Sequence, residues 1–482
     1  MRRFLQFIGG SLMLVAAGCP TSVPALCDNG ACASDDAGGN GDVIGTDGGG
    51  DVVQPPAGCD PAAEPKDSPK CVDSDYGVFV DANGGADGNS GRREAPVKSI
   101  TAALSKLAGK TRVYVCEGTY AEDILLNSAT SLFGGFSCGA FAYTGTKAKV
   151  QPASGTAYAL DISASNLTIA DLEFVGPEQG TPNSIAVRAV DSSAVTLLRT
   201  KLEGRAGANG GTGTRTDFAG FPAQATLDGI AASGATGGAA NEVTCPDGAK
   251  TKGGKGGDNG FSGAPGTPAL AGGAGGILGQ ACAGTGTGGD GSPGATVQGE
   301  GAKTLGTLLQ NAWTPQPGTA GAIGGPGQGG GGGQGSGGGA GGGGGAGGCG
   351  GAAGGPGTGG GASAALLSVN SMLLIRGSEL LAGKGGAGGS GLAGQQGQQI
   401  FGAGANKAGL GCGGGNGGKG GDGGPGGGGA GGVSVGVLYK GPKPTLDATT
   451  TTTGDSGPKG TGGVPTVNDG VDGQKTDALQ VQ

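Results

Sequence analysis

Cysteine offers the widest choice of chemistry in this chain, and its spacing narrows that choice. Eleven cysteines are present, none of them in a C-x-x-C arrangement, and histidine is absent. Without histidine there is no Ser-His-Asp or Cys-His catalysis and no histidine-containing metal site. The missing C-x-x-C spacing argues against a zinc site or a redox motif. Cross-linking and covalent modification are the cysteine chemistry that remains.

The N-terminus has the pattern of a secretory signal. Arg2 and Arg3 precede the apolar run "FLQFIGGSLMLVAAG", and Cys19 follows it. A basic start, a short apolar stretch and small residues before a cleavage point are typical of such signals. The alternative, a transmembrane helix, needs roughly 20 apolar residues and a stop-transfer flank. We therefore predict a signal peptide over residues 1–18.

The residues before Cys19 resemble the lipobox of bacterial lipoproteins. They read "VAAGC", with Ala16 where that family more usually has leucine. The resemblance implies that Cys19 is diacylated and begins the mature chain, anchored to a membrane by more than one acyl chain. Pro20 stands where the family's sorting rule would have Asp for inner-membrane retention, which favours the outer membrane, on its periplasmic or cell-surface face.

The other ten cysteines are even in number, as an oxidising compartment favours. Pairing in sequence order is the simplest arrangement, although spacing does not fix it. The disulfide candidates in that order are Cys27 with Cys32, Cys59 with Cys71, Cys116 with Cys138, Cys245 with Cys282, and Cys349 with Cys412.

Glycine-rich motifs for ions or phosphates are not matched. Calcium-binding nonapeptides need G-G-x-G-x-D-x-U-x with an apolar residue at U, but "GGKGGDGGPGG" has one carboxylate and nothing apolar. A phosphate loop needs Ser or Thr after G-K and then a helix, and "GGKGG" has neither. We therefore predict no catalytic residue, no metal site and no cofactor.

Composition limits the elements that hold these residues in place. Glycine supplies 124 of 482 residues, aromatic residues 4 % and charged residues 14 %, so a thick aromatic core is not expected. The net charge of −8 is mild and argues against binding to nucleic acid. Chains that bury little apolar surface usually stay disordered. Disordered chains are usually rich in charge, however, and this chain is not.

Order is expected from about Tyr76, after a low-complexity tether over residues 19–71. Three motifs then follow: "DANGGADGNSG", "APVKSI" and "VYVCEGTY". Over residues 76–124 they resemble the N-terminal pattern of surface proteins in the pectate-lyase-like superfamily of right-handed parallel β-helices. The resemblance implies a turn, a short helix near Ile100–Leu107 and a strand. Such a helix covers the open edge of the first coil.

Three later segments repeat one apolar pattern: "DISASNLTIADLEF" (161–174), "VDSSAVTLLRTKL" (190–202) and "VNSMLLIRGSEL" (369–380). The aligned columns are Ile162–Val190–Val369, Leu167–Val195–Leu373, Ile169–Leu197–Ile375 and Phe174–Leu202–Leu380. Repeats of this kind predict stacked parallel coils, and an ordinary β-sandwich is the alternative. The predicted fold class is all-β: a right-handed parallel β-helix with an N-terminal capping helix and long glycine-rich insertions.

Two glycine tracts, 204–361 and 382–432, follow equivalent strands of this repeat. They are predicted to leave one corner of adjacent coils. Neither has the uninterrupted G-X-Y period of collagen. Their cysteines and low charge favour order, and they resemble polyglycine-II-like bundles of some bacterial surface proteins and phage adhesins. The alternative is disorder, because ordering glycine costs more backbone entropy than any other residue.

The superfamily resemblance also suggests the hypothesis that the protein is a polysaccharide lyase. In such enzymes outward acidic residues hold calcium, and an Arg or Lys is the base. The outward candidates here are Asp171, Glu173, Arg199 and Lys201. They form no repeating carboxylate cluster, and solvated strand residues explain them better.

These observations predict a lipid-anchored envelope protein with a structural or adhesive role. Its partners would be the membrane and a polysaccharide or another surface protein, not nucleic acid. A polysaccharide-acting enzyme and an inert spacer are the alternatives. The expected segments are the signal (1–18), the tether (19–71), the first part of the β-helix (72–203), insertion one (204–361), a coil (362–381), insertion two (382–432), and a last coil with a polar tail (433–482).

Overall fold

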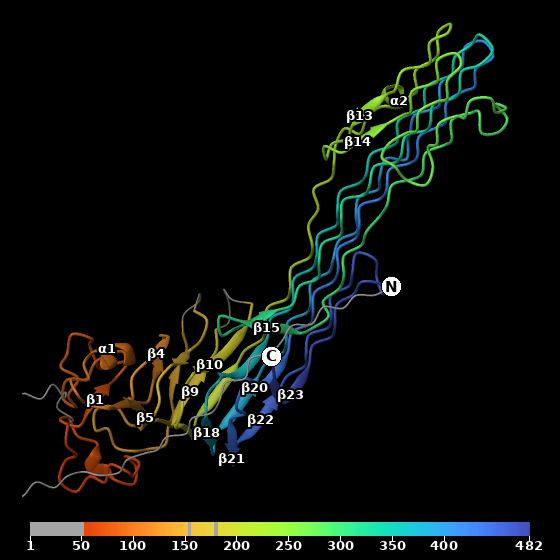
Figure 1. Ribbon diagram of the computed structural model, residues 1–482. Coiled ribbons are helices and arrows are strands. Elements are labelled where there is room, and N and C mark those ends of the chain that lie inside the picture. Colours follow the sequence, from red (N-terminus) through yellow and green to blue (C-terminus); the bar gives the residue numbers. More distant parts are fainter. Residues whose placement is uncertain (1–52, 153–155, 178–181) are drawn as a thin grey trace, which may run out of the picture. The chain divides into compact units, whose positions relative to one another are not determined.

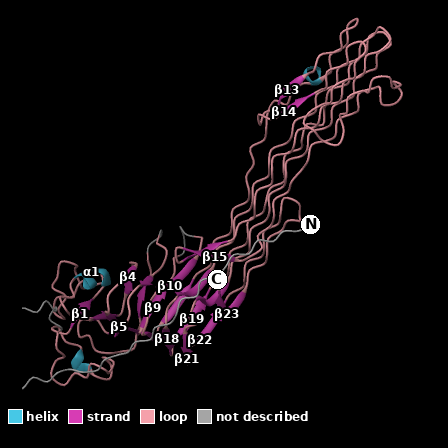
Figure 2. Cartoon of the chain, viewed as in Figure 1, coloured by secondary structure: helices cyan, strands magenta, loops and turns pink. Residues whose placement is uncertain are grey.

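Three parallel sheets hold most of the described strands (Figures 1 and 2). In spatial order, sheet 1 consists of β1 (Gly77–Val80), β2 (Arg112–Cys116), β5 (Ser131–Phe136), β8 (Leu167–Ala170), β11 (Val195–Leu198), β18 (Leu373–Arg376) and β21 (Thr445–Asp447). Sheet 2 consists of β3 (Thr119–Tyr120), β6 (Ala148–Val150), β9 (Leu172–Val175), β12 (Lys201–Gly204), β19 (Glu379–Ala382) and β22 (Thr450–Thr453). Sheet 3 consists of β4 (Ile124–Leu126), β7 (Leu160–Ile162), β10 (Ser184–Val190), β17 (Ser363–Val369), β20 (Ser434–Lys440) and β23 (Lys475–Gln480).

The structure is a computed structural model, and it describes residues 53–152, 156–177 and 182–482. The chain divides into two units, Met1–Gly50 and Asp51–Gln482, and every described residue belongs to the second. The predicted signal peptide, Cys19, Cys27 and Cys32 therefore lie outside the described residues.

From β2 onwards the strands enter sheets 1, 2 and 3 in rotation, apart from two hairpins inside the longest connection. We call one such round a coil. The chain is thus all-β with parallel sheets, as predicted. Parallel pairing excludes the β-sandwich alternative, because the sheets of a sandwich are antiparallel. The remaining elements are η1 (Pro69–Cys71), α1 (Ile100–Ser105), α2 (Gln224–Leu227), and the hairpins β13–β14 (Glu242–Thr244, Lys250–Lys252) and β15–β16 (Gly306–Leu309, Ala312–Pro315).

Three of the four predicted columns are present. The strand registers join Leu167–Val195–Leu373, Ile169–Leu197–Ile375 and Phe174–Leu202–Leu380. The fourth column was wrong by one residue. Ile162 pairs with Ala189 rather than Val190, although Val190 does pair with Val369. Four residues separate Ile162 from Leu167, whereas five separate Ala189 from Val195, because β10 runs one residue further than β7.

The space between the three sheets is filled by stacked aliphatic side chains. Ile162, Ile169, Leu197 and Leu202 are fully buried there, and Ile100 and Ala103 of α1 belong to the same cluster. Burying each large aliphatic side chain stabilises the fold by roughly 1.5–3 kcal/mol. Sheet 1 also has an outer cluster that is aromatic: Phe79, Tyr114, Phe133, Phe136 and Phe141.

Sharp corners between sheets 1 and 2 come from single left-handed residues. Asp171, Arg199, Gly377 and Ala448 occupy this corner in successive coils, with φ values of 56°, 51°, 58° and 46°. The backbone N–H groups of the first three stay satisfied, since Asp171 N donates to Leu198 O at 3.1 Å, and Arg199 N and Gly377 N donate to Arg376 O and Asp447 O at 2.9 Å. The left-handed turn points the side chains of Asp171 and Arg199 outward, where they contact each other.

Three long connections leave the other side of sheet 2, between sheets 2 and 3. Residues 205–362, 383–433 and 454–474 follow β12, β19 and β22 in turn. Their first residues stack, because Gly383 N donates to Gly204 O and Gly454 N donates to Ala382 O, both at 2.8 Å. The shared exit is therefore as predicted. The expected polar tail was wrong, since 433–482 contains a complete coil and a third excursion of the same kind.

The glycine tracts are ordered, and we call residues 205–302, 318–361, 383–432 and 454–474 the glycine bundle. Figure 2 draws its runs as loops lying side by side, because their hydrogen bonds are neither helical nor those of a sheet. Along 339–361, Gly342, Gly345 and Gly348 donate to residues 412, 415 and 418 at 2.9–3.0 Å. Every third residue faces the same neighbouring run, the period of an extended helix with three residues per turn.

Glycine is required at these positions by the closeness of the neighbouring backbone. A Cβ on Gly342, Gly345 or Gly351 would lie 2.0–2.1 Å from a carbonyl oxygen of the run 383–408, far inside van der Waals contact. Every third residue from 339 to 360 is accordingly glycine, and the same holds from 411 to 432. These two runs thus have the strict G-X-Y period that the whole tracts lack, because other residues interrupt the period between the runs.

Buried amide side chains complete the bundle where glycine is interrupted. Gln398 is 5 % exposed, and its Oε1 accepts from Cys349 N at 3.0 Å while its Nε2 donates to Pro222 O at 2.6 Å. Gln328 and Gln334 bridge runs in the same way. A side-chain amide carries the same donor and acceptor as a peptide group, so it replaces one without loss of hydrogen bonding.

Four disulfides are formed in the described chain. Cys59–Cys71 and Cys116–Cys138 follow sequence order, as predicted. The predicted pairs Cys245–Cys282 and Cys349–Cys412 were wrong, because the bonds are Cys245–Cys349 and Cys282–Cys412. Sequence order fails here because the hairpins within 204–361 place residue 349 beside 245 and residue 412 beside 282.

Replacing a packed glycine should disrupt the bundle. A Cβ at position 350 would lie 1.7 Å from Gly324 O, so Gly350→Ala is expected to destabilise the protein by about 1–3 kcal/mol or more. Gly413→Ala is the matched control, because its Cβ would meet only Ala405 O at 3.6 Å. Calorimetric unfolding measures both. Equal transition temperatures for the two variants would contradict the packing described here.

The cross-links predict a definite peptide map. Digestion without reduction should yield linked peptides containing Cys245 with Cys349 and Cys282 with Cys412. Removing the first bond as Cys245→Ser/Cys349→Ser should cost roughly 4–5 kcal/mol in a loop of that length. Linked peptides in sequence order, or free thiols at these four positions, would show that the runs are arranged differently.

Candidate functional site

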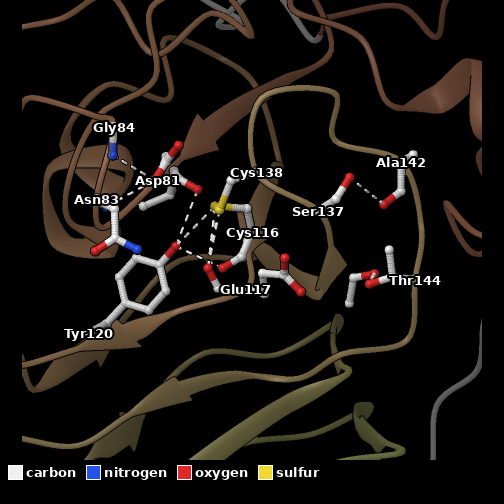
Figure 3. Close-up of a disulfide and its surroundings, with 12 residues drawn as sticks. Asp81, Asn83, Gly84, Cys116, Glu117, Tyr120, Ser137, Cys138, Ala142 and Thr144 are labelled. Carbon is white, nitrogen blue, oxygen red and sulfur yellow. Dashed lines mark hydrogen bonds between the residues drawn. A yellow bond between two sulfur atoms is a disulfide. The ribbon is translucent and has the colours of Figure 1, made fainter.

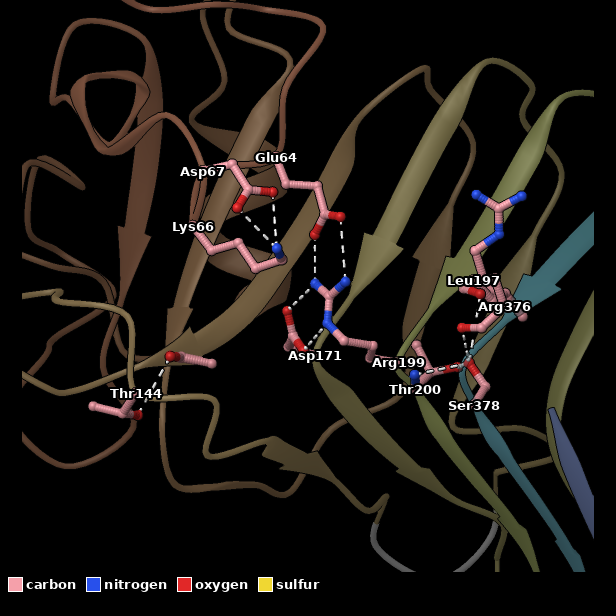
Figure 4. Close-up of polar contacts among 11 residues, drawn as sticks. Glu64, Lys66, Asp67, Thr144, Asp171, Leu197, Arg199, Thr200, Arg376 and Ser378 are labelled. Carbon is pink, nitrogen blue, oxygen red and sulfur yellow. Dashed lines mark hydrogen bonds and ion pairs between the residues drawn. The ribbon is translucent and has the colours of Figure 1, made fainter. Parts of the chain in front are cut away.

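The four outward residues considered for a lyase lie together on the outer surface at the corner between sheets 1 and 2. Arg199 Nε donates to Asp171 Oδ1 at 2.8 Å and its Nη2 to Asp171 Oδ2 at 2.6 Å (Figure 4). Lys201 Nζ lies 3.0 Å from Glu173 Oε1 and 3.2 Å from Glu203 Oε2. The Arg199–Asp171 and Lys201–Glu173 ion pairs join stacked coils, whereas Glu203 is on the same strand as Lys201. The interpretation as separately solvated strand residues was therefore incomplete.

Neither cation is available as a base. Burial would lower the pKa of Lys201, but its bonds to Glu173 and Glu203 outweigh burial and raise it. The pKa of Arg199 is also raised, since the hydrogen bonds to Asp171 and Glu64 exceed the effect of burial. A lyase base must release its proton near neutral pH, and both groups are held in the protonated form.

Arg199 also fixes a segment that was expected to be a free tether. Its guanidinium contacts Glu64, with Nη1 3.2 Å from Glu64 Oε1 (Figure 4). Nearby, Arg112 Nη2 donates to Pro61 O at 2.6 Å, and the Tyr114 hydroxyl donates to Cys71 O. The tether prediction was therefore wrong for residues 59–71, which the Cys59–Cys71 bond closes into a loop hydrogen-bonded to Arg112 and Tyr114 of sheet 1.

The motif "DANGGADGNSG" serves to hold its own turn. Asp81 Oδ1 accepts from Asn83 N and Gly84 N at 2.8–2.9 Å (Figure 3). Asp87 Oδ1 accepts from Lys98 N, Ser99 N and Ser99 Oγ. Burial opposes ionisation of Asp87, but these bonds outweigh it and lower its pKa. Asp81 therefore closes the turn, and Asp87 fastens it to the start of α1.

One group among the described residues brings potential metal ligands together. A carboxylate oxygen of Asp81 and the sulfurs of Cys116 and Cys138 lie within 4.8 Å of one another. The two sulfurs form a disulfide (Figure 3), whereas a cysteine binds a metal as a free thiolate. Tyr120 donates to Cys116 O at 2.9 Å, and burial raises the pKa of its hydroxyl. This group is structural.

A cavity of about 360 Å³ lies on the outer side of sheet 3. Its polar lining comes from Asp123, Tyr158, Asp161 and Arg188. Arg188 bonds both oxygens of Asp161 and lies 4.5 Å above the Tyr158 ring. The guanidinium charge is balanced by Asp161, and Nη1 also donates to Asn311 O at 3.4 Å, so this cation is already paired within the protein.

The turns at the end of the bundle remote from the sheets form a different surface, which sequence analysis missed. We call it the distal face and define it by Phe261, Ile277, Leu278 and Leu410. Phe261 and Leu410, at 66 % and 68 %, are the two most exposed large apolar side chains of the described chain. Hydrogen bonds link their turns, because Gly335 N donates to Phe261 O and Ser336 Oγ donates to Leu410 O.

A cavity of about 490 Å³ opens within the distal face. Ile277, Cys282, Thr285, Thr287 and Asp290 line it, and glycine backbone forms the rest of the wall. Leu278 N donates to Ser262 Oγ at 2.9 Å, which places the cavity rim beside Phe261. The Cys282–Cys412 disulfide holds the cavity wall to the residues that follow Leu410.

The chain matches no described protein family, no curated protein and no solved structure. Among the described residues, no helix has the length and apolar character needed to cross a membrane. The functional argument therefore depends on the sequence and on the geometry given above.

Removing Arg199 should release the N-terminal segment. Arg199→Ala leaves the carboxylate of Asp171, only 6 % exposed, without its partner, and is expected to cost about 2 kcal/mol. Arg376→Ala is the control, because its bond to Asp447 is about half exposed on both sides and should change stability by less than about 0.5 kcal/mol. Trypsin should cut after Lys66 sooner in the first variant only. Equal cutting rates would mean that Arg199 does not hold the segment.

Proposed function

We propose that the protein is a lipid-anchored component of a bacterial envelope with a structural or adhesive role. The observation that carries this proposal is the glycine bundle, whose interior is mostly hydrogen-bonded backbone, completed by a few buried amide side chains and two disulfides. Such an element performs no chemistry of its own. It holds the distal face at a fixed distance from the coils, as a structural or adhesive protein requires.

The finer assignment of the fold belongs to the same proposal. Rotation of the strands through three parallel sheets supports a parallel β-helix, and connections between parallel strands are right-handed almost without exception. α1 packs its buried residues into the aliphatic cluster near β1 and β2, which supports a capping role. The threefold hydrogen-bond period supports packing of the polyglycine-II type for the bundle.

The reach of the bundle suits display at a surface. An extended threefold helix rises about 3.1 Å per residue, so the run 339–361 spans roughly 70 Å. The formed disulfides support an oxidising location outside the cytoplasm. Together with the sequence before Cys19, they support an outer-membrane anchor and contact with a polysaccharide or another surface protein.

A polysaccharide-acting enzyme has less support. Its candidate base residues, Arg199 and Lys201, are held as cations in ion pairs. In the cavity beside Arg188, that guanidinium is paired with Asp161 and is not available as a base. A lyase built on this chain would need a proton acceptor elsewhere.

The anchor is tested by detergent phase partitioning of the full chain made in a bacterium. The wild type should enter the detergent phase and incorporate labelled fatty acid, whereas Cys19→Ser should remain in the aqueous phase without label. Cys27→Ser/Cys32→Ser is the control and should behave as the wild type, because it keeps Cys19. A Cys19→Ser protein that still partitions into detergent would refute the lipid anchor.

A further inference from the structure

The distal face has the two halves of an interlocking contact. Phe261 projects from a turn and is 66 % exposed. Beside it lies the cavity of about 490 Å³, with Ile277 and Thr285 in its wall. The volume is ample for a phenylalanine side chain, and ligand-sized cavities begin at roughly 300 Å³. A contact between two identical surfaces requires a projection and a matching recess on the same face.

The chemistry of the face favours a protein over a sugar or a bilayer. Residues 205–302 and 383–432 contain no Tyr or Trp, the aromatic residues that combine a ring with a hydrogen-bonding group. A membrane surface would cover the exposed side chains but would leave the recess unfilled. A folded protein partner can both cover the exposed side chains and fill the recess with a side chain of its own.

Charge on the face is balanced, which suits a contact with itself. Lys255 and Asp258 form an ion pair at 3.1 Å next to the turn of Phe261. Asp290 lines the cavity, and Lys407 lies three residues before Leu410. Two positive and two negative groups give no net charge, so two copies do not repel each other as like-charged faces would.

We propose that the distal face binds the distal face of a second copy, with Phe261 of each copy entering the cavity of the other. This deepens the proposed adhesive role and depends on it for the location at a cell surface. Two anchored copies on facing cells would meet end to end. The face as defined has four apolar side chains and one cavity, whereas a standard stable interface has about 20–30 residues a side. The contact is therefore weak singly and becomes effective when many copies act together.

The test uses the full chain with Cys19→Ser, which removes the predicted lipid, in sedimentation velocity at concentrations up to the order of 100 µM. The parent should show a reversible monomer–dimer equilibrium. Phe261→Ser removes the projection and should weaken association by about thirtyfold, as loss of a central aromatic residue does. Gly284→Trp fills the recess and should weaken association similarly. The fold should tolerate this variant, because a Cβ at Gly284 meets only Ala281 O at 3.6 Å.

Mixing the two variants separates this contact from general apolar adhesion. Phe261→Ser keeps the recess and Gly284→Trp keeps the projection, so the mixture should associate more strongly than either variant alone. Leu309→Ser removes a comparably exposed side chain (59 % against 66 % for Phe261) in β15, beside the sheets (Figure 1), and should leave association unchanged. Thermal unfolding confirms that each variant is folded.

Three results would overturn the proposal: a parent that stays monomeric at every concentration, equal weakening by Leu309→Ser, or no rescue in the mixture. Flotation of the monomeric parent with phospholipid vesicles, lost in Phe261→Ser, would assign the face to a lipid surface instead. None of these results depends on whether Cys19 carries lipid, so failure of this contact is distinguishable from failure of the anchor.

Discussion

Close approach between glycine backbones is the constraint on which the rest of this structure depends. Ordering glycine costs more backbone entropy than ordering any other residue, roughly 0.5–1 kcal/mol relative to alanine, and each hydrogen bond returns a net gain of about 0.5–1.5 kcal/mol. The balance is favourable only if the runs start at the right spacing. The coils supply that spacing, because neighbouring parallel strands lie about 4.8 Å apart. Gly207 N donates to Lys384 O and Gly385 N to Asp455 O directly beyond the strands, so the bundle continues the ladder of sheet 2.

Outward charges contribute to the same register. Asp161 bonds Arg188, Asp171 bonds Arg199, and Arg376 bonds Asp447, each pair joining one coil to the next. A slip of one residue would move every such side chain to the opposite face of its sheet. These pairs therefore specify how coils stack, and they explain why charged residues recur on the strands without forming a catalytic cluster.

Sequence could predict the features that repeat coil by coil. The columns through Leu167 and Phe174 and the shared exit of the tracts were predicted, because both recur at a constant spacing. Sequence analysis missed the features that arise where one segment folds back on another. The threefold glycine period, the Cys245–Cys349 bond and the docking of residues 59–71 all depend on contacts between distant segments. The distal face did leave a local signal. Gly260 and Gly409 have φ values of 88° and 55°, and each directly precedes a large apolar residue at a turn, Phe261 and Leu410.

The two long-range disulfides lie where the coils no longer control the runs. Near the sheets, strand pairing holds each run in place, but this influence weakens along a run that is roughly 70 Å long. Cys245–Cys349 joins two runs further out, and Cys282–Cys412 joins two runs at the distal turns. Binding by a mobile loop loses affinity to the entropy of ordering that loop. The Cys282–Cys412 bond beside the cavity restricts these turns before a partner binds, and so reduces the loss of affinity. The cross-links therefore serve the distal face as much as the stability of the fold, and this explains why a bundle already rich in hydrogen bonds has one at its far end.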